Sequence, residues 1–249
     1  MELIYVFILG SAIGSFLNVL ILRTPRDESV SFPASHCMSC NTPLRIWHNI
    51  PILSWIFLRG KCAFCGEKIS VQYPFIEFLS GIIFVLSALK LGLTFQAFGV
   101  ALTFDLLLAL SVIDFRYKMV PDSINLSALT VAMLSAVSLE QLGYNITNAL
   151  LFAGGFTLLR FYLSYAIKKE AMGEADIMIA ATMGALLGVQ LGLVAIFLGA
   201  VLALPALLLT QGETEDSKQL PFIPFLAMGC WIVLMFDTTV TVYLAGLYG

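Results

Sequence analysis

Apolar segments long enough to cross a lipid bilayer recur along almost the whole chain, and they limit what it can fold into. A helical span needs about 20 apolar residues to cross the bilayer core, with a range of about 17–25. We expect an all-α polytopic membrane protein with about eight transmembrane helices. The division between the sixth and seventh segments rests only on Gln190 and Gly192. The expected segments cover residues 3–22, 75–93, 95–113, 123–139, 147–167, 177–190, 191–210 and 221–246.

The composition argues against a soluble domain and against nucleic acid as a partner. Hydrophobic residues make up 59% of the chain and charged residues only 12%, whereas soluble domains carry about 25% charged residues. The mean hydropathy is +0.94. The net charge of −3, the pI of 5.3 and the lack of basic runs are not those of a nucleic-acid-binding protein. The lipid bilayer is therefore the first expected partner.

Basic residues indicate which side of the membrane the connections face. If connections alternate sides, all but one of the 13 Lys and Arg residues fall on one face, and Lys90 falls on the other. The positive-inside rule makes the basic face cytoplasmic, so both termini point away from the cytoplasm. A count of seven spans would move only the connection that carries Lys218. We expect the first segment to be retained, because Met1-Glu2 lacks the basic start of a signal peptide and the apolar run ends at Arg23.

The polar stretch at 23–74 holds five of the nine prolines. Long helices are not expected there, and a segment this small needs a staple in order to fold. The expected organisation is a first transmembrane helix at 1–23, a cytoplasmic insert at 24–73 and a multi-helix transmembrane core at 74–249. The charged run at 211–219 is expected to be a solvated connector.

Two Cys-x-x-Cys pairs in the insert predict a four-thiolate zinc site. Cys37 and Cys40 form one pair, and Cys62 and Cys65 form the other. This spacing is typical of tetrahedral Zn²⁺ sites, and Gly66 suits the tight turn that such a pair makes. Four protein ligands close the coordination shell, so the metal would be structural, and a cytoplasmic location disfavours disulfides. The alternative is four free or redox-active thiols.

Two acidic residues border apolar segments at the same expected depth. Asp114 closes the third segment and Asp176 opens the sixth, both at the cytoplasmic face. An ionisable group there is a functional candidate if it faces a protein cavity. Two carboxylates that share one proton can activate water for amide hydrolysis, because the ionised partner accepts a proton while the protonated partner polarises the carbonyl. The spacing alone leaves two separate interfacial acids as the alternative.

Other acids near the spans have plainer interpretations. Asp122 is expected at the start of the fourth helix, where a negative charge is favourable to the helix dipole, and a role near the site stays open. Glu77 falls at the cytoplasmic end of the second span. Asp105 lies about 13 Å deeper than Asp114 along an ideal helix, which is too far for direct participation. A transporter would need charged pairs in mid-membrane, and Asp105 alone supports that alternative poorly.

Several motifs, in their order along the chain, resemble those of the bacterial type IV prepilin peptidases, which are polytopic aspartyl proteases of the inner membrane. They cover nearly the whole chain, so together they are more specific than any single motif. By this resemblance Asp114 and Asp176 match the two catalytic aspartates, with Asp122, Gly173, Glu174 and Glu77 as supporting residues. Besides the double Cys-x-x-Cys, the motifs are Gly14-Ser-Phe-Leu-Asn-Val-Leu-Ile-Leu-Arg23, Tyr73-Pro-Phe-Ile-Glu77, Ile113-Asp-x5-Val-Pro-Asp122 and Leu220-Pro-Phe-Ile-Pro-Phe225.

The resemblance also implies substrates, a cofactor and a location. The substrates would be prepilins or pseudopilins, whose short basic leader is removed at the cytoplasmic membrane face. The form with a cysteine-bearing insert is also associated with N-methylation of the new N-terminus, with S-adenosylmethionine as methyl donor. No glycine-rich nucleotide-binding loop is visible in the sequence. The implied location is the bacterial cell inner membrane, multi-pass, with the active site facing the cytoplasm.

One position departs from the family's pattern. The second aspartate commonly lies in Gly-x-Gly-Asp, whereas this chain has Gly173-Glu-Ala-Asp176. Alanine is costly at positive φ, so activity would suffer if Ala175 had to adopt such a backbone. We expect an ordinary helical φ at Ala175 and no harm. A catalytically silent zinc-binding membrane scaffold is an alternative that only Ala175 supports, and a polytopic transporter is the other alternative.

Overall fold

The computed structural model describes residues 1–209 and 221–248, and these residues are helical apart from loops and two isolated β-bridges. This confirms the expected all-α class. The expected connector at 211–219, with Lys218, and the first residue of the Leu220 motif lie outside the described residues.

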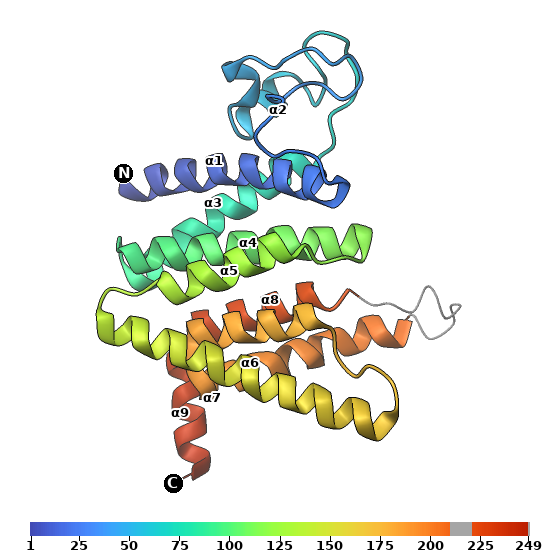
Figure 1. The fold of residues 1–249 in the computed structure, drawn as a ribbon. Helices are drawn as coiled ribbons and strands as arrows, with labels where there is room; N and C mark the ends of the chain where they lie inside the picture. Colours follow the sequence, from blue (N-terminus) through green and yellow to red (C-terminus); the bar gives the residue numbers. More distant parts are fainter. Residues whose placement is uncertain (210–220, 249) are drawn as a thin grey trace. The chain divides into compact units, whose positions relative to one another are not determined.

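The chain divides into two compact units, Met1–Ala101 and Leu102–Gly249 (Figure 1). The boundary falls inside one helix, α4, so each unit is described by itself. The helices of the first unit are α1 (Glu2–Arg23), η1 (Thr24–Arg26), η2 (Ile46–Asn49), α2 (Leu53–Phe57), α3 (Gln72–Leu91) and the start of α4 (Phe95–Tyr117). Those of the second are the rest of α4, α5 (Asp122–Leu134), α6 (Leu139–Ile167), α7 (Glu174–Leu209), α8 (Ile223–Met235) and α9 (Asp237–Tyr248).

Five described helices are long and apolar enough to cross a membrane, and a sixth span results if α8 and α9, bent by 81°, count as one. About eight segments were expected, more than the described helices that meet this criterion of length and apolarity. The expected fourth segment forms the 13-residue α5, about 20 Å long against a hydrocarbon core of about 30 Å. The expected sixth and seventh segments lie in α7, which joins two helices across a kink at Gly188. The five helices are Glu2–Arg26, Gln72–Leu91, Phe95–Tyr117, Leu139–Ile167 and Glu174–Leu208.

Helix α7 contains a break at Gly188, where φ is 73° and ψ is −177°. A β-carbon built on Gly184 would lie 2.6 Å from the Phe152 ring, and one built on Gly192 would lie 2.7 Å from the same ring. Eight residues of straight helix cover about 12 Å, so the chain must bend for both positions to reach one ring. The break lies just before Gln190, which with Gly192 had indicated the division between the sixth and seventh segments.

In the first unit, α1 and α3 lie side by side (Figure 1). The helices approach so closely that a β-carbon on Gly14 would lie 2.8 Å from the Cα of Glu77. Such close approach is typical of small residues at contacts between membrane helices. Asn18 of α1 donates from Nδ2 to the backbone oxygen of Tyr73, at 3.2 Å. The two motifs that begin at Gly14 and Tyr73 therefore form one interface.

The polar insert between α1 and α3 contains only short helices, as its prolines predicted; the longest, α2, has five residues. Trp55 of α2 donates from Nε1 to the backbone oxygen of Ile69, at 3.2 Å, which ties α2 to the end of the insert. The insert has little apolar core of its own, since its large apolar residues such as Trp47 and Phe57 are exposed. Its fold must therefore depend on something other than hydrophobic burial.

In the second unit, α5, α6 and α8 pack against α7. Small residues line these contacts, with Ala132, Ala149 and Ala185 forming one buried cluster. Phe104 of α4 and Trp231 of α8 pack edge to face with ring centroids 4.6 Å apart. This packing fixes the end of α4 and the starts of α7 and α8, which carry the candidate site.

Candidate functional site

Asp114 lies in the last turn of α4 and is 8% exposed. Its Oδ2 accepts a hydrogen bond from the backbone N–H of Ile223 at 3.2 Å, and the N–H of Phe222 also donates to this carboxylate. These residues form the start of α8, where backbone N–H groups have no partner within the helix and carry partial positive charge. The Pro-Phe-Ile-Pro motif therefore holds the Asp114 carboxylate in place.

Asp176 lies in the first turn of α7. The backbone N–H of Gly173 donates to its carboxylate. A β-carbon on Gly173 would lie 3.3 Å from Asp176 Oδ2, closer than an ordinary contact. Gly173, a predicted supporting residue, thus contacts the carboxylate directly and leaves room for it.

Ala175 belongs to the first turn of α7 and does not adopt a positive φ. This agrees with the expectation that alanine is harmless at this position. The backbone oxygen of Ala175 accepts a hydrogen bond from Nδ2 of Asn125, at 3.1 Å, and Asn125 is fully buried in α5. Sequence reasoning missed Asn125; its only signal was a polar residue within an apolar helix, three positions after Asp122.

The two aspartates belong to the same unit, and their carboxylates are near enough for Asp176 to repel the charge of Asp114. A single carboxylate of this kind could be an acid at the membrane surface with its hydrogen bonds made and no chemical role. Two that interact, each oriented by backbone N–H groups, can instead share a proton and act as an acid and a base.

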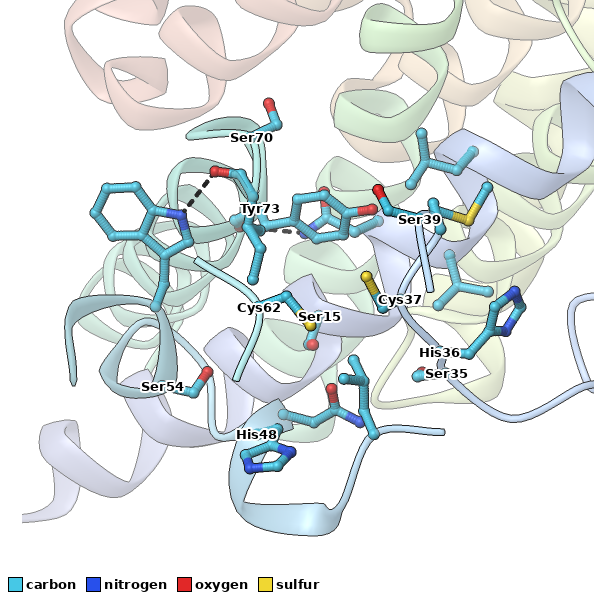
Figure 2. A pocket seen from close by; sticks show the side chains of 18 of the residues that line it. Ser15, Ser35, His36, Cys37, Ser39, His48, Ser54, Cys62, Ser70 and Tyr73 are labelled. Atoms are coloured by element: carbon cyan, nitrogen blue, oxygen red, sulfur yellow. Dashed lines mark hydrogen bonds between the residues drawn. The ribbon is translucent and has the colours of Figure 1, made fainter. Parts of the chain in front are cut away.

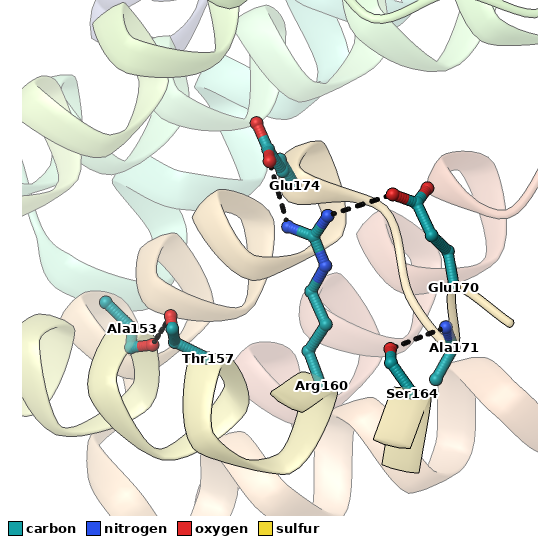
Figure 3. A network of polar contacts seen from close by, with 7 residues as sticks. All are labelled: Ala153, Thr157, Arg160, Ser164, Glu170, Ala171 and Glu174. Carbon is teal, nitrogen blue, oxygen red and sulfur yellow. Dashed lines mark hydrogen bonds and ion pairs between the residues drawn. The ribbon is translucent and has the colours of Figure 1, made fainter. Parts of the chain in front are cut away.

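Glu174 faces Arg160 of α6, with Oε1 3.0 Å from Nη1 (Figure 3). The same guanidinium lies 3.7 Å from Glu170, and Ser164 accepts a hydrogen bond from the N–H of Ala171 at 3.1 Å. These contacts tie the α6–α7 loop to α6. Glu174 therefore supports the loop that carries the second aspartate, and Arg160, which sequence reasoning missed, is its partner.

The other two predicted supporting residues lie apart from these contacts. Asp122 is exposed in the first turn of α5, and in the described part of the chain its side chain has no hydrogen-bond or ion-pair partner. It fits the plain interpretation as a favourable charge at a helix start. Glu77 belongs to α3 in the first unit, where it is 7% exposed.

The four cysteines of the insert form a cluster that can hold a metal ion. Their four sulfur atoms lie within 4.8 Å of one another, and Cys37 Sγ is 3.8 Å from Cys65 Sγ. Tetrahedral Zn²⁺ with bonds of about 2.3 Å places its sulfur ligands about 3.8 Å apart, so the donor set fits this ion. The residue after each pair, Asn41 and Gly66, has a positive φ, which forms two matching turns. The turn expected at Gly66 is confirmed.

The thiols of this cluster affect one another's ionisation. A hydrogen bond with Thr42 lowers the pKa of Cys40 to about 6. At Cys65 the backbone N–H of Glu67 favours the thiolate, but burial and the neighbouring sulfurs outweigh it and raise the pKa to about 12. Four thiolates so close together repel, and a bound divalent cation removes that repulsion.

Two protein-family models match the chain. The model described as Bacterial Peptidase A24 N-terminal domain matches residues 8–91, and the Type IV leader peptidase family model matches residues 101–208. The boundary between the two models coincides with the boundary between the two structural units, Met1–Ala101 and Leu102–Gly249. The interacting aspartates fall within the second match.

Curated relatives match over most of the chain. A prepilin leader peptidase/N-methyltransferase of Neisseria gonorrhoeae is 31% identical over 94% of this chain and 90% of its own length. One of Myxococcus xanthus is 35% identical over 88% of this chain and 68% of its own length. A type 4 prepilin-like proteins leader peptide-processing enzyme of Escherichia coli is 32% identical over 88% of both chains. No solved structure matches significantly. These matches confirm the resemblance that the ordered motifs indicated.

Proposed function

Because the chain belongs to the bacterial type IV prepilin leader peptidase family, peptidase family A24, we propose that it removes the leader peptide from type IV prepilins or pseudopilins. It is an aspartic endopeptidase and a multi-pass membrane protein. The observation that carries the proposal is the interacting pair Asp114 and Asp176, which lies in the part of the chain matched by the leader-peptidase model.

In the proposed mechanism the two carboxylates hold one proton. Backbone N–H groups stabilise a negative charge at both positions, from Phe222 and Ile223 at Asp114 and from Gly173 at Asp176. The ionised aspartate takes a proton from water as the water oxygen attacks the scissile carbonyl carbon, and the protonated aspartate gives its proton to the carbonyl oxygen. As the diol collapses, the first aspartate protonates the leaving nitrogen, the C–N bond breaks and the second aspartate recovers a proton from the diol. The dyad ends in its starting charge state.

Three further residues position Asp176 in this mechanism. Gly173 donates its N–H to the carboxylate, Asn125 anchors the backbone at Ala175, and Arg160 ties the preceding loop to α6. Correct placement matters because a misplacement of about 1 Å can cost a hundredfold in rate.

The proposed location is the bacterial inner membrane with the dyad at the cytoplasmic face. The supporting feature is the excess of Lys and Arg on one side of the expected spans, including Arg116 and Lys118 just after Asp114. The substrate's basic leader then lies in the cytoplasm, and its apolar helix lies in the bilayer beside the enzyme.

The proposed second activity is N-methylation of the newly exposed pilin N-terminus. It is supported by the names of relatives that align over most of both chains. S-adenosylmethionine would supply the methyl group, which its positively charged sulfonium makes transferable to an amine. Zn²⁺ is the proposed ion at Cys37, Cys40, Cys62 and Cys65, where it would supply the staple that the insert lacks.

The peptidase proposal is tested by cleavage of a purified prepilin, followed by mass spectrometry. Asp114→Asn and Asp176→Asn are each expected to slow cleavage by about 10²–10⁴-fold. Glu140→Gln, which removes an exposed acid in the first turn of α6, is the matched control and should cleave like wild type. Undiminished cleavage by either aspartate variant would refute the dyad. Transfer of label from S-adenosylmethionine to the processed pilin tests methylation separately.

A further inference from the structure

The first unit contains a cavity of about 470 Å³ that the peptidase mechanism does not use. It lies between the end of α1, the insert and the start of α3, and Figure 2 shows Ser15, His48 and Tyr73 around it. Cavities of about 300–1,000 Å³ are typical binding sites for small molecules. The wall includes Cys37 and Cys62, so the four-cysteine cluster borders the cavity.

Glu77 is a buried acid in the wall of this cavity. Its Oε2 accepts a hydrogen bond from the N–H of Ile52 at 2.7 Å, and the hydroxyl of Ser15 also contacts the carboxylate. Arg23, Arg26 and Lys68 also line the cavity, but no described Lys, Arg or His forms an ion pair with Glu77. Buried carboxylates are normally paired, so a carboxylate that lines a cavity without a basic partner calls for a cationic ligand.

The backbone of Ile52, which donates to Glu77, is a second unusual feature beside this cavity. Its φ is 62°, a backbone conformation that is a genuine outlier for a β-branched residue. Such outliers cost about 1–3 kcal/mol and persist where surrounding contacts hold them, often at binding sites. Here the contact is the hydrogen bond from Ile52 to Glu77.

Asn18 leaves an unused hydrogen-bond acceptor in the same wall. It is 1% exposed, and its Nδ2 is committed to the backbone oxygens of Gly14 and Tyr73. Its Oδ1 is buried and has no partner among the described residues. A buried polar atom normally has a partner, so this oxygen calls for a ligand with an N–H or O–H donor.

We propose that this cavity is the methyl-donor site, with Glu77 facing the sulfonium of S-adenosylmethionine and Asn18 accepting a hydrogen bond from its nucleoside or amino group. The proposal rests on the proposed N-methyltransferase activity. The donor is a cation at its sulfur, whereas the product thioether is neutral. Glu77 therefore selects the donor over the product, because only the donor carries a positive charge at the sulfur that faces this carboxylate.

Two probes separate this charge from the rest of the ligand. In sinefungin a carbon that bears an ammonium group replaces the methylated sulfur, whereas S-adenosylhomocysteine has a neutral thioether there. In the full-length protein at pH 7, isothermal titration should show sinefungin binding at least about tenfold more tightly. Glu77→Gln should lower the sinefungin affinity at least about tenfold and change the S-adenosylhomocysteine affinity less than about threefold. Asp27→Asn removes an exposed charge outside the cavity and should change neither.

A second variant tests the cavity itself. Ser35→Trp places a large ring in the cavity wall at a half-buried loop position and should weaken both probes alike. Equal effects of Glu77→Gln on both probes, unchanged binding in Ser35→Trp, or no binding of either probe to wild type would each overturn the proposal. Prepilin cleavage by each variant reports on folding and on the peptidase separately, so failure here is distinguishable from failure of the peptidase function.

Discussion

Replacing Gly173 with alanine adds one methyl group beside the Asp176 carboxylate and leaves the backbone N–H in place. The added β-carbon would lie 3.3 Å from Asp176 Oδ2, and Gly173 has no positive φ that would strain an alanine. Because ordinary contacts begin at about 3.4 Å, the carboxylate must move by a few tenths of an ångström. The hydrogen bond to Asp176 persists, so the change is one of position.

The size of the effect follows from this shift. If a misplacement of about 1 Å costs about a hundredfold, a shift of a few tenths costs about three- to tenfold. The loss should appear in kcat, with KM nearly unchanged, because Gly173 contacts the dyad.

The assay is steady-state cleavage of a prepilin, with Gly155→Ala as the matched control. A β-carbon at Gly155, inside α6, would have nothing within 4 Å. Alanine is favoured over glycine in a helix by about 1 kcal/mol, so this control should be as active as wild type and slightly more stable. Equal kcat in the Gly173 and Gly155 variants would refute the reasoning.

Three further predictions follow from individual contacts. Asn125→Ala removes the hydrogen bond to Ala175. It should lower the free energy of unfolding by about 1 kcal/mol and also lower kcat. An unchanged melting temperature and an unchanged kcat would contradict this role. Arg160→Gln should slow cleavage less than about threefold. The side chains of its partners Glu170 and Glu174 are 86% and 82% exposed, and exposed ion pairs contribute about 0–1 kcal/mol. A larger loss of rate in the cleavage assay would contradict this expectation. Cys37→Ser should abolish metal binding. Wild type should release the metal as the pH falls, because protons compete with it for the thiolates. Metal content measured by mass spectrometry checks both expectations, and metal retained by the variant would exclude the four-thiolate site.

Features encoded in local spacing were predictable from the sequence. The cysteine cluster followed from two short pairs, because each pair folds into a turn that its own residues determine. The electrostatic contact of Asp114 with Asp176 agrees with the prediction from their equal depth at the ends of two apolar segments. The prediction that Ala175 is helical was also correct, since it precedes a long apolar helix.

Features that depend on contacts distant in sequence were not predictable. The N–H groups that hold Asp114 come from a helix start 109 residues further along the chain. In the sequence, Arg160 was only one of several basic residues near a helix end. Its ion pair with Glu174 forms only when the loop between α6 and α7 is folded. Hydropathy did not show that the helix of the fourth segment ends at Leu134. Nor did the motif around Glu77 show that this acid lines a cavity.

The most direct test of the dyad is single-turnover cleavage by Asp114→Asn, Asp176→Asn and the double variant. Residues that act as one unit are strongly non-additive, so the double variant should be about as slow as the slower single variant. A double variant whose loss equals the product of the two single losses, or a single variant as fast as wild type, would contradict the account.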